Sequence, residues 1–108
     1  MTGIDIDVCP DEGTVRLCFR GELDLVGAAE VRRAACEAER RAGPLLVADL
    51  RGLDFIDSSG LALLVELERG RRARGGRMAV LAAASGRIAK VLRCSGLDQV
   101  LDVRVSAS

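Results

Sequence analysis

The first twenty residues contain two segments in which apolar and polar side chains alternate. One spans residues 4–8 and the other spans residues 15–20. A period of two is typical of strands with one buried face. Pro10-Asp11-Glu12-Gly13 lies between them and has the composition of a turn. The pattern therefore predicts an antiparallel hairpin.

Three later segments have the period of amphipathic helices. Residues 25–42 place small apolar side chains on one stripe and charged side chains opposite, with Asp24 as the predicted cap and Gly43-Pro44 as the stop. Residues 58–74 form the second predicted helix, which ends before Gly75-Gly76. Residues 86–94 form the third, with Ser85 as its cap and Gly96 as its end.

Two continuous apolar runs, residues 45–50 and 78–82, separate these helices. Such runs are typical of parallel strands that are buried on both faces. Residues 101–105 alternate again and predict a last strand. The order ββαβαβαβ predicts an α/β fold, with residues 1–108 forming one domain and a mixed sheet flanked by helices.

The second predicted helix has two distinct sides. Its buried stripe is formed by Leu61, Leu64, Val65 and, at the margin, Leu67. The opposite side is predicted to be an exposed patch of mixed character beside Ser58, made of Ser59, Ala62, Leu63 and Glu66.

The motif Asp57-Ser58-Ser59-Gly60 stands where this helix begins. Asp and Ser are favoured there because their oxygens accept hydrogen bonds from the first free N–H groups. The helix end also carries partial positive charge, and ligands of open α/β sheets gather beyond the carboxyl ends of strands. Ser58 is therefore the candidate chemical group, with an ordinary helix cap as the alternative interpretation.

Charge does not favour a nucleic-acid partner. Residues 1–57 carry 12 acidic and 7 basic side chains, and residues 58–108 carry 4 and 9, for a formal net charge of zero. The densest basic run, residues 69–77, has no aromatic side chains to stack on bases, because Phe19 and Phe55 are the two aromatics. Arginines matched to the dipole of a helix C-terminus are the better interpretation.

The composition also argues against an enzyme, a metal site and a cofactor. There is no His, which removes the usual catalytic triads. The cysteines at positions 9, 18, 36 and 94 form no C-x-x-C pair and are read as thiols in a reducing compartment. Asp49, Asp54 and Asp57 lack the D-x-D-x-[ST] order of aspartyl-phosphate phosphatases. Gly70 and Gly75 have the P-loop separation, but Gly76-Arg77 stands where Lys and Ser or Thr are required.

No apolar run approaches the roughly 20 residues needed to span a bilayer, and the first residues lack the pattern of a signal peptide. A cytoplasmic protein without membrane insertion is therefore expected. The polar outer faces of the predicted helices favour a monomer.

Four motifs, taken in order, resemble the STAS domain family and within it the bacterial anti-sigma-factor antagonists. They cover nearly the whole chain at family-like spacing and are Gly21-Glu22-Leu23-Asp24, Asp57-Ser58-Ser59-Gly60 with the preceding Leu53 and Phe55, Gly75-Gly76, and Ser95-Gly96-Leu97. One feature departs from the family: relatives usually continue into a final helix, whereas this sequence stops at Ser106-Ala107-Ser108.

The resemblance implies regulation by partner switching. Ser58 matches the serine that is phosphorylated by an anti-sigma factor, which is also a serine kinase of the GHKL ATPase type. The unphosphorylated antagonist binds that protein and frees a sigma factor, and a PP2C-type phosphatase resets the phosphorylated form. The expected partner surface comprises Asp24, Asp57, Ser59, Gly60, Ala62, Leu63 and Glu66. The alternative is a stand-alone STAS regulatory subunit of a transporter or sensory complex.

Overall fold

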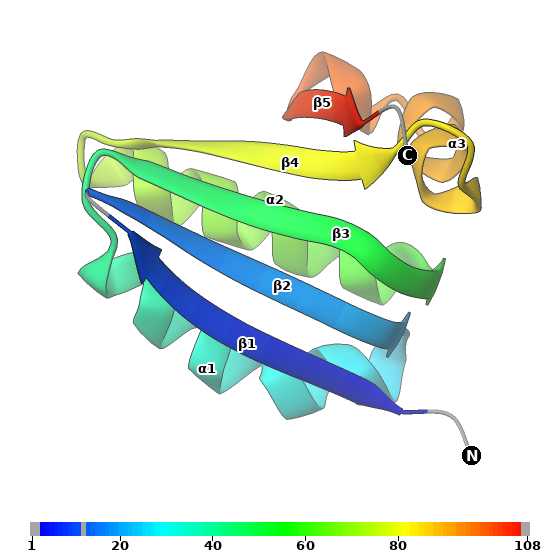
Figure 1. The fold of residues 1–108 in the computed structure, drawn as a ribbon, viewed down its shortest axis with the longest axis horizontal. Helices are drawn as coiled ribbons and strands as arrows, with labels where there is room; N and C mark the ends of the chain where they lie inside the picture. Colours follow the sequence, from blue (N-terminus) through cyan, green and yellow to red (C-terminus); the bar gives the residue numbers. More distant parts are fainter. Residues whose placement is uncertain (1–2, 12, 107–108) are drawn as a thin grey trace.

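The computed structural model describes residues 3–11 and 13–106 and contains one five-stranded sheet with three α-helices (Figure 1). The strands lie side by side in chain order: β1 (Ile4–Asp11), β2 (Thr14–Leu23), β3 (Leu45–Ile56), β4 (Arg77–Ala83) and β5 (Asp102–Ser106). β1 pairs antiparallel with β2, and the other neighbours are parallel. The predicted hairpin and mixed α/β sheet are confirmed; residue 12 of the turn and the C-terminal Ala107-Ser108 lie outside the described residues.

The helices α1 (Leu25–Arg41), α2 (Ser58–Ala73) and α3 (Arg87–Cys94) follow β2, β3 and β4. Figure 1 shows α1 and α2 side by side behind the sheet. Each crossover advances by one strand in the same direction, and right-handed crossovers of that kind place their helices on the same face. The core between sheet and helices is aliphatic apart from Phe19, and its largest fully buried side chains include Leu17, Leu23, Leu46, Leu50, Leu64 and Leu92.

The opposite face of the sheet is partly open to solvent. On β3, Leu46 and Ala48 are fully buried, but the alternate residues Leu45 and Val47 are only half-buried and lie outside the core. The prediction that the run at residues 45–50 is buried on both faces is therefore wrong. Apolar content alone could not show that α1 and α2 both cover the same face.

β3 is also longer than predicted, since it continues past Leu50 to Ile56. Two shifts in its register with β2 change the spacing of its buried residues from two to three, giving Leu50, Leu53 and Ile56. Because of these bulges, this part of the strand lacks the alternation of apolar and polar residues by which strands are predicted. Gly52 makes room at the first shift, where a Cβ atom would lie 2.7 Å from Cγ of Arg20.

The helix ends agree with the predictions except at α3. Gly86 is its N-cap and makes no side-chain hydrogen bond, so the predicted Ser85 cap is wrong. Gly96 ends this region in the left-handed conformation, with φ of 80°, as its position after α3 suggested. A short 3-10 helix, η1 (Leu97–Gln99), then leads to β5 and was not predicted.

A buried ionic cluster joins the C-terminal halves of α1 and α2. Glu39 accepts a hydrogen bond from Nη1 of Arg74 at 2.5 Å and lies 3.6 Å from Nε of the buried Arg71. Arg71 donates to the carbonyl oxygens of Ala42 and Gly43 beyond the end of α1. Gly70 makes room for this cluster, because a Cβ atom there would lie 2.5 Å from Oε1 of Glu39.

Candidate functional site

The amino end of α2 presents the hydroxyl group that the sequence singled out. Asp57 is the N-cap, and its Oδ1 accepts hydrogen bonds from the backbone N–H groups of Ser59 at 2.9 Å and Gly60 at 3.3 Å. Ser58 is the first residue of the helix and is exposed. Because the Asp57 side chain accepts from two of the free N–H groups, the Ser58 hydroxyl is not needed as a cap.

Close backbone packing fixes this helix end against the end of β2. The N–H of Asp57 donates to the carbonyl of Leu23 at 3.3 Å. Gly60 is buried, and a Cβ atom at that position would lie 2.4 Å from the same carbonyl oxygen. The start of α2 is thereby held beside the turn that leads into α1.

That turn carries Asp24, which is the N-cap of α1. Its Oδ1 accepts a hydrogen bond from the N–H of Gly27 at 2.8 Å, which confirms the predicted cap. Asp24 and Asp57 thus occupy equivalent positions at the amino ends of two neighbouring helices. The structure brings Asp24, Asp57, Ser58 and Ser59 to the same edge of the sheet, because β2 and β3 are parallel and both end there.

Further along α2, Ala62 and Glu66 are exposed, as predicted. Glu66 forms an ion pair with Arg32 of α1 and accepts a hydrogen bond from the thiol of Cys36 at 3.7 Å. Burial raises the pKa of the Cys36 thiol, and the Glu66 carboxylate raises it further. The outer surface of α2 therefore continues onto α1.

Leu63 is not part of this surface. It is completely buried, so its predicted exposure is wrong. The prediction assumed a stripe that faces the sheet alone, but α2 packs against α1 as well as β3 and β4. The wider buried arc includes Leu63, Leu64 and Leu67, whereas Leu61 and Val65 are half-buried.

Exposed apolar side chains occur instead in the first turn of α1. Leu25 is 70% exposed and Val26 is 64% exposed. Phe55, near the end of β3, is 46% exposed. Their exposure was not predicted from the sequence, because an apolar residue is expected to be buried unless the direction of its side chain is known.

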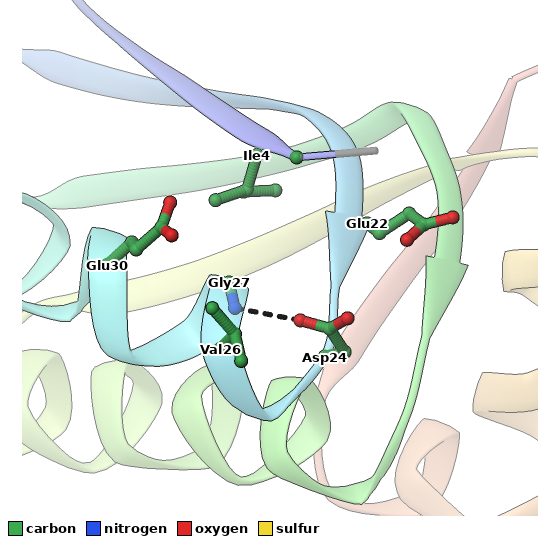
Figure 2. A pocket seen from close by; sticks show the side chains of 7 residues that line it. Ile4, Glu22, Asp24, Val26, Gly27 and Glu30 are labelled. Carbon is green, nitrogen blue, oxygen red and sulfur yellow. Dashed lines mark hydrogen bonds between the residues drawn. The ribbon is translucent and has the colours of Figure 1, made fainter. Parts of the chain in front are cut away.

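A hollow of about 250 Å³ lies between the start of β1, the end of β2 and the first turns of α1. Figure 2 shows Glu22, Glu30 and Val26 around it, together with the hydrogen bond between Asp24 and Gly27. A neighbouring hollow of about 670 Å³ adds three charged side chains, those of Asp5, Arg20 and Asp54.

The two hollows form an acidic groove. Its single lining cation, Arg20, pairs with Asp7 at 2.8 Å, and Glu22, Glu30 and Asp54 make no ion pair within the described residues. No sequence pattern links these acids, because the topology collects them from separate elements. Among residues 3–11 and 13–106, no group of three or more His, Cys, Asp or Glu side chains could hold a metal ion.

This fold and the Asp-Ser-Ser-Gly turn define a class of protein. A family model described as "Mlab, STAS domain" matches residues 7–103, so the chain belongs to the STAS domain family.

No helix within the described ranges is long and apolar enough to cross a membrane.

Solved structures of similar fold include proteins described as anti-sigma factor antagonists. An anti-sigma factor antagonist from Mycobacterium paratuberculosis has a TM-score of 0.85 at 24% identity, over 96% of this chain and 87% of that chain. Unphosphorylated SpoIIAA, also an anti-sigma factor antagonist, gives 0.77 at 24% identity over 96% and 90%. The Bacillus cell fate determinant SpoIIAA in its phosphorylated form gives 0.71 at 25% identity over 96% and 93%.

Proposed function

We propose that this protein is an anti-sigma-factor antagonist controlled by phosphorylation of Ser58. Its unphosphorylated form binds an anti-sigma factor and frees a sigma factor, and phosphorylation abolishes that binding. The observation that carries the proposal is the exposed Ser58 hydroxyl at the amino end of α2, which leaves capping to Asp57. Membership of the STAS family and a similar fold solved in phosphorylated and unphosphorylated forms support it.

The fold tolerates a phosphate at this position. Phosphorylation adds about −1.5 to −2 charges at neutral pH. Negative charge at a helix amino end is stabilising by roughly 0.3–1 kcal/mol, because it interacts with the positive end of the helix dipole. The phosphorylated protein therefore keeps its structure.

A bound partner does not tolerate the phosphate. Ser58 stands at an edge that already holds the acidic Asp24 and Asp57 and the exposed apolar Leu25 and Val26. A dianion there must be desolvated or matched by the partner, and a loss of about 1.4 kcal/mol already weakens binding tenfold.

The proposed partner surface combines the polar edge with the outer side of α2. It contains Asp24, Asp57, Ser59, Ala62 and Glu66, with Leu25 and Val26 as its apolar part in place of Leu63. Gly60 contributes indirectly, by allowing α2 to approach Leu23.

The partner is an anti-sigma factor with serine kinase activity of the GHKL ATPase type, and a PP2C-type phosphatase removes the phosphate. The protein itself acts as a cytoplasmic, monomeric binding module and catalyses no reaction. Turnover of generic phosphoesters that is lost in Asp57→Asn would contradict this part of the proposal.

The test uses the anti-sigma kinase co-purified with the protein from its native cell. Ser58→Ala should bind it but accept no phosphate. Ser58→Asp should bind at least about tenfold more weakly, a loss of roughly 1.4 kcal/mol, while melting at nearly the same temperature. Affinity is measured by calorimetry and the site by mass spectrometry.

Ser59→Ala is the matched control, since it changes a neighbouring hydroxyl and should still be phosphorylated. Phosphate found on Ser59, or equal affinity of Ser58→Asp and the wild type, would refute the assignment. Recovery of a transporter ATPase in place of a kinase would favour the alternative of a STAS regulatory subunit.

A further inference from the structure

Two cysteines lie together on the open face of the sheet, away from the Ser58 edge. In the antiparallel register of β1 and β2, Cys9 pairs with Arg16 and Cys18 pairs with Asp7. Cys9 and Cys18 are therefore diagonal neighbours on the same face. Both are free and half-buried.

The register places the two thiols close together, and Cys9 is one of the neighbours that raise the pKa of the Cys18 thiol. Diagonal residues of an antiparallel pair have Cα atoms about 7–8 Å apart, whereas a disulfide requires roughly 4.4–6.8 Å. Closing a bond thus needs the two strands to approach by at least about 1 Å. β1 can supply this movement because, among the described strands, this edge strand is hydrogen-bonded to β2 alone.

Small molecules can reach Cys18 from solvent. A shallow hollow of about 570 Å³ on this face is lined by Cys18, Arg16, Asp49 and Arg51. Arg51 pairs with Asp49 at 2.8 Å, but the exposed Arg16 makes no ion pair within the described residues. Arg16 is thus available to attract an anion into the hollow.

The groups around Cys18 have opposing effects on the pKa of its thiol. Burial raises the pKa of the Cys18 thiol, Arg16 lowers it, and Asp49 and Cys9 raise it further. The reactive thiolate is therefore scarce at neutral pH. A negatively charged oxidant is attracted by Arg16, which raises the concentration of the oxidant beside the Cys18 thiol.

We propose that Cys9 and Cys18 form a reversible disulfide-exchange site for anionic low-molecular-weight disulfides, such as glutathione disulfide. The Cys18 thiolate attacks one sulfur of the oxidant, forming a mixed disulfide and releasing one thiolate. The Cys9 thiolate then attacks the Cys18 sulfur of that bond, closing the protein disulfide and releasing the second thiolate. The two protein thiols lose two electrons, the oxidant gains them, and the two protons pass to the released thiolates through solvent.

The bond would tie the edge strand β1 covalently to β2. Because the diagonal placement strains it, it belongs to the easily reduced class of disulfides. The site is independent of the proposed function, since it uses neither Ser58 nor any residue of the proposed partner surface.

The experiment uses the full chain with Cys36→Ser and Cys94→Ser, which leaves the two thiols of interest. Incubation with glutathione disulfide should remove two hydrogen masses without dimerisation, raise the melting temperature and slow hydrogen exchange in β1. Dithiothreitol should reverse all three effects. The matched control, Cys9→Ser with Cys18→Ser, retains Cys36 and Cys94 and should give only glutathione adducts.

Adding Cys9→Ser to the two-thiol protein should trap glutathione on Cys18. A stable adduct on both thiols of the two-thiol protein, or a disulfide between chains, would overturn the proposal. Arg16→Gln should slow both reactions, because Arg16 lowers the pKa of the Cys18 thiol, but it should slow the reaction with glutathione disulfide at least about threefold more than that with neutral hydroxyethyl disulfide. Equal slowing of both reactions would overturn the role of Arg16.

Discussion

Gly60 shows how one missing side chain positions the proposed phosphorylation site. A Cβ atom there would lie 2.4 Å from the Leu23 carbonyl oxygen and 2.7 Å from Cγ1 of Ile56. We expect Gly60→Ala to lower the free energy of unfolding by about 1–2 kcal/mol, because the clash outweighs the roughly 1 kcal/mol gained in helix propensity. Urea titration followed by circular dichroism measures the change.

Gly86→Ala is the control for that substitution. A Cβ atom at Gly86 meets nothing closer than 3.5 Å, so its cost should stay below about 1 kcal/mol. A Gly60→Ala protein as stable as the wild type would show that the close approach to β2 is not required.

The Asp49 carboxylate makes the stability of the protein depend on pH. Its oxygens accept hydrogen bonds from Nε of Arg51 at 3.0 Å and Nη2 at 2.8 Å, and these bonds hold the pKa of Asp49 below its usual value. A depressed pKa contributes stability that is present above the ordinary value of about 3.9 and is lost as the pH falls through the depressed one.

Asp49→Asn should therefore lose less stability than the wild type when the pH is lowered from about 5 to below 3. Thermal melts across this range measure the difference. Asp54→Asn is the comparison, since Asp54 is exposed and makes no ion pair in the described part of the chain. Parallel curves for Asp49→Asn and the wild type would contradict the assignment.

At the scale of elements, α1 and α2 are joined by an ion pair that water barely reaches. The side chains of Glu39 and Arg71 are 6% and 5% exposed. Removing one partner leaves a buried charge uncompensated, so Glu39→Ala should cost about 3–5 kcal/mol. On the same helix, Glu37→Ala removes an exposed pair with Arg33 and should cost less than about 1 kcal/mol.

The double substitution Glu39→Met with Arg71→Met separates charge from packing. It should recover most of the stability lost in Glu39→Ala, because no buried unpaired charge then remains. Arg74 also loses Glu39, but its side chain is 43% exposed and stays hydrated. Denaturant midpoints compare the three proteins. If Glu39→Ala and Glu37→Ala proved equally mild, the cluster would not hold the helices together.

Helix boundaries set by local chemistry were predictable from the sequence, except at the start of α3, where Gly86 and not Ser85 is the N-cap. The caps Asp24 and Asp57 and the glycines after each helix fix boundaries through backbone preferences, which neighbouring residues alone reveal. The full length of β3 and the burial of Leu63 were not predictable, because both depend on partners distant in sequence. The bulges in β3 arise from its register with β2, and the burial of Leu63 depends on the contact between α1 and α2.

At the scale of the whole molecule, one part of the candidate site comes from a contiguous motif and the other part is assembled by the fold. Ser58 could be proposed from a contiguous motif, because its exposure follows from its place at a helix start. The acidic groove could not, since Glu22, Glu30 and Asp54 come from three separate parts of the chain. Only the parallel order of the strands brings them to the edge where α1 and α2 begin.

Within α2, the exposed Ser58, Ala62 and Glu66 alternate with the buried Gly60, Leu63 and Leu67. A single short helix thus carries two separate sets of residues, an exposed set available to other proteins and a buried set that packs against the rest of the domain. Substitutions at the exposed positions can change which protein is bound without disturbing the buried positions. Homologous proteins can therefore differ in specificity while sharing one fold.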